Sequence, residues 1–306
     1  MIRNFLFHQV NPTRNRLWDP IDVTLFEKCI KYITQKYEVV LMEDLVFSGK
    51  LQVKNKQAAL MFDDGYKDNI EYAVPILDYY KCKASFYVVT DCIDFNQPTW
   101  THILDHIFLY TGKTDIHIDF DFLPTGLRTK SLLSLEERVK YVTKLKPFLK
   151  TLSNACKNKV LDRVKETCSD VELPKLMMNW NDLKALKNSG HYIGSHTKTH
   201  SMLGTMTEED DINNELLHSG NRIKEALGYF PMTISYPVGC YNDATKRLAK
   251  EAGYKIGLAV KQNVHSPAKE DCFEISRIEL YNEPWWKTKL RITNALENIK
   301  TLIGYK

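Results

Sequence analysis

Short apolar runs alternate with amphipathic stretches along most of the chain. The apolar runs are rich in β-branched and aromatic residues, which favour strands, and the stretches between them repeat apolar residues at helical spacing. Strand and helix in alternation predict a parallel sheet with helices outside it, and seven or eight such units favour a barrel over an open sheet. The expected strands are 2–8, 38–42, 58–64, 84–90, 192–196, 232–237, 255–260 and 275–280, and the expected helices are 25–36, 69–80, 181–189, 208–227, 244–252 and 287–303.

Residues from about 95 to 178 interrupt this alternation. They contain a helical segment at 100–110 and a charged helical stretch at 135–164, with few strand signals. No internal repeat, low-complexity tract or flexible linker separates them from the rest. We therefore expect a single α/β domain over residues 1–306, a distorted (β/α)7-8 barrel with a mostly helical insertion at about 95–178.

Composition and charge exclude several classes of protein. The chain has 306 residues, of which 43% are hydrophobic and 26% charged, so a sizeable core is expected and wholesale disorder is not. The net charge of +4 is mild and dispersed, so no nucleic-acid partner is expected. No apolar run approaches the roughly 20 residues of a membrane helix. If Met1 is the native start, the first residues lack a signal peptide and a cytoplasmic protein is expected.

The seven cysteines are scattered and include no Cys-x-x-Cys pair, so we expect neither a disulfide framework nor a cysteine metal site.

Two adjacent carboxylates follow the expected strand at 58–64, in the motif Phe62-Asp63-Asp64-Gly65. In α/β barrels the carboxyl ends of the strands carry the active site. Two neighbouring aspartates crowd negative charge there, which a cation or a proton would offset. An Asp-Gly turn or a helix cap would use the same residues. The motif by itself leaves both interpretations open.

Two histidines, His196 and His200, follow the expected strand at 192–196. Their spacing brings them to one face if the segment turns into a helix. Imidazole nitrogen is a favoured ligand of zinc and neighbouring transition metals. Surface or capping histidines would show the same spacing. Their place at a strand end favours an open metal site of two imidazoles and one carboxylate.

A third motif, Tyr236-Pro237-Val238-Gly239, leads from a strand into a helix. As structure it is an ordinary βα turn. As function it would direct backbone N–H groups at a developing oxyanion.

In their order and rough spacing, the three motifs resemble those of the polysaccharide deacetylase family, which has the NodB homology domain and is also called carbohydrate esterase family 4. The resemblance covers about 58–94 and 178–280 and leaves out the insertion. It implies a distorted barrel that removes N-acetyl groups from an amino sugar in a polysaccharide or its precursor. An N-acetylated sugar is then the substrate. The resemblance further implies one divalent metal ion as cofactor, with Zn2+ preferred and Co2+, Ni2+ or Fe2+ as alternatives.

The resemblance also implies a role for each motif residue. Asp63 matches the general base, and Asp64, His196 and His200 match the metal ligands. Val238 matches the position whose backbone N–H contacts the oxyanion. This agrees with the chemistry, because a metal polarises the amide carbonyl while a second carboxylate, held off the metal, takes a proton.

Two positions depart from the family pattern. Ser235 stands where the turn motif usually begins with an Arg that orients the base. Arg277, in the late strand, could supply that guanidinium, although an Arg at a strand edge is more often in a surface ion pair. The family's usual C-terminal histidine, the general acid, is also not evident, because His265 lies in a loop-like segment.

His8 is the better candidate for the acid, because the first and last strands of a closed barrel are neighbours. The segment Phe5-Leu6-Phe7-His8 resembles the start of the permuted branch of the family, which includes poly-N-acetylglucosamine deacetylases. We interpret the remaining histidines as structural: His102, His106, His117, His191 and His218.

Two alternatives remain at this stage. A metal-free glycoside hydrolase would use paired carboxylates, but these must face each other across a sugar, which adjacent Asp63 and Asp64 cannot do. A catalytically inactive glycan-binding barrel stays open because the motif Arg is missing. The sequence does not specify the sugar.

Overall fold

The structure, a computed structural model, describes residues 2–47, 56–265 and 271–295. Within these residues one parallel sheet has the strand order β10–β1–β3–β4–β7–β8–β9, and β2 pairs with β3 outside this path. Its strands are β1 (Ile2–Phe7), β2 (Glu38–Val39), β3 (Gln57–Phe62), β4 (Ser85–Val88), β7 (Tyr192–Ser195), β8 (Thr233–Ser235), β9 (Ile256–Leu258) and β10 (Ile278–Glu279).

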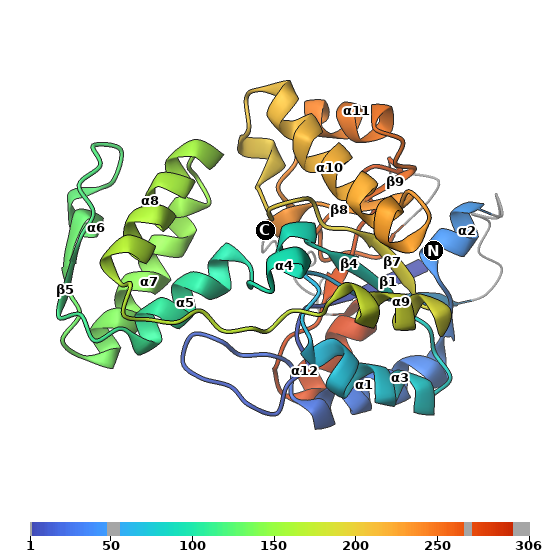
Figure 1. Cartoon of the computed structure of the whole chain (residues 1–306). Helices are drawn as coiled ribbons and strands as arrows, with labels where there is room; N and C mark the ends of the chain where they lie inside the picture. Colours follow the sequence, from blue (N-terminus) through green and yellow to red (C-terminus); the bar gives the residue numbers. More distant parts are fainter. Residues whose placement is uncertain (1, 48–55, 266–270, 296–306) are drawn as a thin grey trace.

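The sheet curls into a distorted barrel with helices around it (Figure 1). A parallel bridge joins Leu258 of β9 to Ile275, on the segment that leads into β10. On its other side β10 pairs with β1. The expected fold class is therefore confirmed, and the first and last strands are neighbours.

The barrel helices follow the predicted pattern except for α4, which was not expected and begins at Thr90, the last residue of an expected strand. They are α1 (Val23–Lys36), α3 (Val74–Tyr79), α4 (Thr90–Phe95), α9 (Trp180–Asn188), α10 (Glu209–Leu227), α11 (Asp243–Glu251) and α12 (Trp285–Ile292). In α1 the buried residues Phe26, Cys29, Ile30 and Ile33 recur at helical spacing. The helix expected at 69–80 is divided into a π-helical turn, Asn69–Ala73, and α3. Residues 296–303 of the last expected helix lie outside the described residues.

The strand expected at 38–42 is wrong beyond Val39, because Met42 begins the helix α2 (Met42–Phe47). This helix places the buried Glu43 carboxylate where it accepts hydrogen bonds from Ser85 (2.7 Å), Tyr87 (2.8 Å) and Thr233 (2.9 Å). Burial raises the pKa of Glu43, and the three hydroxyl donors oppose that shift. These contacts join α2 to β4 and β8. The short apolar run from which a strand was expected here contains no information about such distant partners.

The insertion is mostly helical, with α5 (Trp100–Tyr110), α6 (Thr125–Arg128), α7 (Leu135–Leu149) and α8 (Asn154–Thr167). It also contains an antiparallel pair, β5 (Asp115–His117) and β6 (Thr129–Ser131). Its apolar residues form a buried cluster that includes Leu104, Phe108, Tyr141, Leu145 and Val160. Figure 1 shows α6, α7 and α8 to one side of the barrel, at the left of the view.

All seven cysteines are free, and four of them, Cys29, Cys82, Cys92 and Cys168, are buried. Among the helices of the described ranges, none combines the length and the apolar character that crossing a membrane requires.

Candidate active site

The carboxyl ends of the strands bring the predicted motifs together. Asp63 and Asp64 directly follow β3, His196 follows β7 and His8 follows β1. The N–H of Asp63 donates to the carbonyl of Phe7 (3.0 Å), which ties the end of β3 to the end of β1. Because parallel strands end at one edge of the sheet, residues far apart in sequence share one site.

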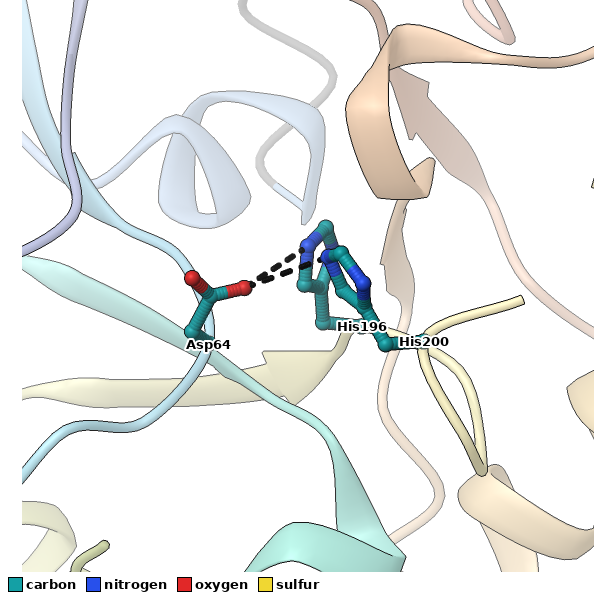
Figure 2. A group of neighbouring side chains, drawn as sticks. All are labelled: Asp64, His196 and His200. Carbon is teal, nitrogen blue, oxygen red and sulfur yellow. Dashed lines mark ion pairs between the residues drawn. The ribbon is translucent and has the colours of Figure 1, made fainter. Parts of the chain in front are cut away.

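The side chains of Asp64, His196 and His200 face one another (Figure 2). Asp64 Oδ1 lies 3.4 Å from Nε2 of each histidine, and the three ligand atoms lie within 4.8 Å of one another. Asp64 Oδ1 and His200 Nδ1 are buried without a hydrogen-bond partner. Unpaired buried polar atoms are costly, and two imidazoles with one carboxylate form a common open metal site. The three residues therefore fit a divalent cation.

The loop that carries the histidines is not the helix that their spacing suggested. Thr197 and His200 have positive φ angles of 69° and 60°, in the left-handed region. Glu215 of α10 accepts hydrogen bonds from the N–H groups of Lys198 (3.0 Å) and Thr199 (2.9 Å). A turn held by Glu215, rather than helical periodicity, brings the two rings together, and sequence reasoning missed Glu215.

The electrostatics of this cluster favour a cation. Burial lowers the pKa of His200 to about 3, so its ring is neutral at pH 7 and has a free lone pair. Burial also lowers the pKa of His196, but the carboxylates of Asp63 and Asp64 outweigh it and raise the pKa. His196 Nδ1 lies 2.8 Å from the carbonyl oxygen of Ser235, which leaves Nε2 directed at Asp64.

Asp63 is held differently from its neighbour. Arg277 pairs with it in a bidentate manner, with Nη1 2.8 Å from Oδ1 and Nη2 2.9 Å from Oδ2. The Ser235 hydroxyl donates to Oδ2 at 3.0 Å. Burial raises the pKa of Asp63, but the charge and hydrogen bonds of Arg277, together with the charges of His196 and His8, outweigh burial and lower the pKa. Arg277 is fully buried, so its ion pair is not a surface one.

His8 lies at the same edge and is 38% exposed at its side chain. Its Nδ1 is 3.4 Å from Oε1 of Glu279, and its carbonyl accepts a hydrogen bond from Asn69 (2.9 Å). Burial raises the pKa of Asp63 and of Asp64, and the charge of His8 is one of the weaker influences that lower it. Sequence reasoning missed Glu279, although it follows Arg277 by two residues and so shares its face of the strand.

Val238 lies in the short turn Pro237–Gly239 with φ 59° and ψ 11°. A β-branched residue in the left-handed region is an outlier, and such strain gathers at functional sites. The residue as a whole is 40% exposed. His265 lies elsewhere, since its backbone pairs with Ile2 at the opposite end of β1 from His8.

The fold and this set of residues define the class of protein: a distorted β/α barrel with a candidate hydrolytic site at the carboxyl ends of its strands. The family model for polysaccharide deacetylase matches residues 50–257, which include both aspartates, both histidines and the turn at Val238. The chain therefore belongs to the polysaccharide deacetylase family, and the resemblance seen in the sequence is confirmed.

Solved structures show the same fold. The deacetylase PplD of Streptococcus pyogenes, in complex with acetate, has a TM-score of 0.61 at 18% identity, covering 95% of this chain and 97% of that one. The de-N-acetylase of Aggregatibacter actinomycetemcomitans has a TM-score of 0.61 at 15% identity, covering 95% and 99%. IcaB of Ammonifex degensii has a TM-score of 0.61 at 15% identity, covering 95% and 96%. No curated protein matches this chain in sequence.

Proposed function

We propose that this deacetylase is metal-dependent and removes the N-acetyl group from an amino sugar in a polysaccharide or its precursor. The observation that carries the proposal is that two neighbouring aspartates have different contacts. Asp64 Oδ1 faces two imidazoles without a hydrogen bond, whereas Asp63 is held by Arg277. One carboxylate is free to ligate, and the other is kept for proton transfer.

Asp64, His196 and His200 would hold the cation, with zinc as the first choice and cobalt, nickel or iron(II) as alternatives. When bound, the ion polarises the acetamide carbonyl and makes water more acidic.

Asp63 acts as the general base. The lowered pKa keeps its carboxylate ionised, and Arg277 with Ser235 fixes the orientation of both oxygens. Arg277 thereby takes the part that the family's motif Arg plays, because Ser235 is too short to do so. Asp63 accepts a proton from the attacking water as the hydroxyl adds to the carbonyl carbon.

His8 acts as the general acid on the leaving nitrogen. Its Nδ1 is directed at Glu279, which leaves Nε2 to donate a proton. The backbone N–H of Val238 donates to the oxyanion that develops on the carbonyl oxygen. The C–N bond then breaks, the nitrogen takes the proton from His8, and acetate leaves.

The two alternatives have less support. A glycoside hydrolase would need carboxylates on opposite sides of the sugar, but Asp63 and Asp64 are neighbours and Asp63 is paired with Arg277. The inactive barrel was kept open by the missing motif Arg, and Arg277 now offers that guanidinium to Asp63.

The first prediction tests the metal. His200→Ala removes most of the bound metal together with acetate release from N-acetylglucosamine oligomers, because two ligands hold a divalent ion poorly. Metal analysis of the purified protein and an acetate assay measure both quantities. His218→Ala, an exposed histidine on α10, is the matched control and keeps both. Full metal occupancy in the His200 variant, or acetate release that survives a strong chelator, would contradict the proposal.

A further inference from the structure

A cavity of about 320 Å³ lies where the insertion meets the barrel. Its walls come from α4, α5 and one face of α8, on which Lys157, Leu161 and Lys165 follow one another at intervals of four residues. Its volume is near the lower end of the roughly 300–1,000 Å³ of small-molecule sites. The cavity thus lies between the barrel helix α4 and the insertion helices α5 and α8.

One wall of the cavity is the loop that carries the candidate metal ligands. Thr199, one of the lining residues, directly precedes His200, whereas Asp64, His196 and His200 do not themselves line the cavity. This loop therefore connects the candidate metal site to the cavity.

Lys157 is the least ordinary residue of the lining. It is 2% exposed, yet in the part of the chain that the structure describes its ammonium makes no hydrogen bond or ion pair. Its Nζ lies 5.2 Å from the centre of the Trp100 ring, a cation–π contact. Burial lowers the pKa of Lys157 to about 8. The charge of the buried Glu215 carboxylate opposes that shift, and the N–H donors of the ammonium are left for a ligand oxygen.

The remaining lining indicates what kind of ligand fits. Two carboxylates, Asp91 and Asp162, balance the two amines of Lys157 and Lys165, so the cavity does not favour a strongly charged group. Gln97 and Asn158 add planar amides that both donate and accept.

Aromatic surface completes the cavity. Trp100 lines its buried part, and Phe95 is 69% exposed at its edge. Aromatic faces beside hydroxyl-binding polar groups suit a sugar ring, which has an apolar face and a hydroxylated rim.

A second cavity continues along the same helix. It has a volume of about 420 Å³ and shares Asn158 with the first. Asn154, Thr205 and Asn214 also line it, so it is polar and lies between α8 and the start of α10. The two cavities thus lie next to each other along α8, on either side of Asn158.

We propose that the cavity between α4, α5 and α8 binds a neighbouring sugar of the substrate chain, with Lys157 and Asn158 as donors to its oxygens. This inference rests on the proposed function, and it adds the position of a subsite for a second sugar, on α8 of the insertion, so that an oligosaccharide is preferred to a free monosaccharide. The insertion then determines the preferred chain length, while the barrel holds the acetyl group.

The test compares N-acetylglucosamine with its β-1,4- and β-1,6-linked di- to hexasaccharides, using kcat/KM for acetate release. The wild-type value rises with chain length. Lys157→Met, which keeps the stem of the side chain, lowers the ratio of hexasaccharide to monosaccharide about tenfold, as expected for a lost hydrogen bond to a charged donor. Asn158→Ala, at an exposed position, lowers it too. Lys159→Met, an exposed lysine of α8 that lines neither cavity, leaves the ratio unchanged.

A binding measurement separates this inference from the proposed function. Calorimetric titration with the fully deacetylated hexasaccharide needs no turnover, and both cavity variants weaken its binding whereas Lys159→Met does not. Binding of this kind without acetate release would overturn the proposed function and keep the sugar site. Acetate release with no dependence on chain length, or a ratio that neither cavity variant lowers, would overturn the sugar site and keep the proposed function.

Discussion

At the scale of single residues, the site depends on how two neighbouring aspartates are surrounded. Asp63 accepts from Arg277 through both oxygens, and Asp64 Oδ1 is left beside two imidazoles without a hydrogen bond. A buried carboxylate paired with a guanidinium stays ionised, and an unpaired one gains most from a cation. The same kind of side chain thus has two different environments at consecutive positions, which is why we propose two different roles for it.

Replacing the proposed base tests this division of roles. Asp63→Asn keeps nearly the same shape and leaves Asp64 untouched, so metal content stays normal. Its amide cannot accept a proton, and we expect kcat for deacetylation to fall by about a hundredfold or more. Acetate release, metal analysis and a thermal melt are measured on the same sample. Near-normal turnover would mean that the base is another residue.

The proposed acid is tested by comparing two leaving groups. His8→Asn lowers turnover of the amide by a factor of roughly 10² to 10⁴, because a sugar amine leaves poorly without a proton. An activated acetate ester, whose leaving group needs no proton, is affected much less, and metal content is unchanged. Equal losses on amide and ester would assign His8 a structural role.

At the scale of elements, the junction between β4 and β7 depends on His191. Its Nδ1 accepts the N–H of Ala84 at 3.1 Å, and the N–H of Tyr192 donates to the Ala84 carbonyl at 3.1 Å. Burial lowers the pKa of His191 to about 4. Its role is structural, and it aligns the two strands whose far ends lead to the site.

This junction predicts a dependence of stability on pH. Unfolded histidine has a pKa of about 6.5, so as the pH falls below that value the unfolded chain binds a proton that folded His191 does not. Its contribution to stability is therefore present above pH 6.5 and is lost as the pH falls toward 4. His191→Asn keeps an acceptor for Ala84 and does not titrate.

Urea unfolding at pH 7.5 and at pH 5 measures the difference. Between pH 7.5 and pH 5 the free energy of unfolding falls by about 1 kcal/mol more in the wild type than in His191→Asn, after allowance for solvent screening of the ring. Equal losses in the two proteins would show that the ring is protonated in the folded state.

At the scale of the whole molecule, the barrel and the insertion have separate apolar clusters. The barrel cluster includes Leu60, Phe62 and Phe86, and the insertion cluster includes Leu145 of α7. Regions with their own core can open without global unfolding. We therefore expect the insertion to open independently of the strand ends that carry the candidate site.

Hydrogen exchange tests this separation. Leu145 is fully buried, so Leu145→Ala leaves a cavity in the insertion core and lowers the free energy of unfolding by about 2–5 kcal/mol. We expect this change to speed amide exchange mainly in α5, α7 and α8. Leu60→Ala is the matched change in the barrel and speeds exchange mainly in its strands. Uniform acceleration across both regions in either variant would show one cooperative unit.

The sequence by itself determined the alternation of strands and helices in the barrel and most residues of the candidate site. Apolar periodicity and turn residues are local properties, so the sequence alone predicts the β/α alternation. It also predicts the strand-end motifs at Asp63, Asp64, His196 and Val238. The prediction was wrong at 38–42, because a short apolar run is compatible with either a strand or a helix. A strand was expected there, but the helix α2 begins at Met42.

Only the tertiary structure decided which distant partners meet. Arg277 reaches Asp63 across 214 residues, and Glu279 reaches His8 from the last strand. Glu215 holds the histidine loop, and Lys157 of the insertion lies near the ligand end of that loop. Periodicity gives the type of each element, but strand register and the curvature of the sheet bring particular atoms together, and both depend on packing across the whole barrel.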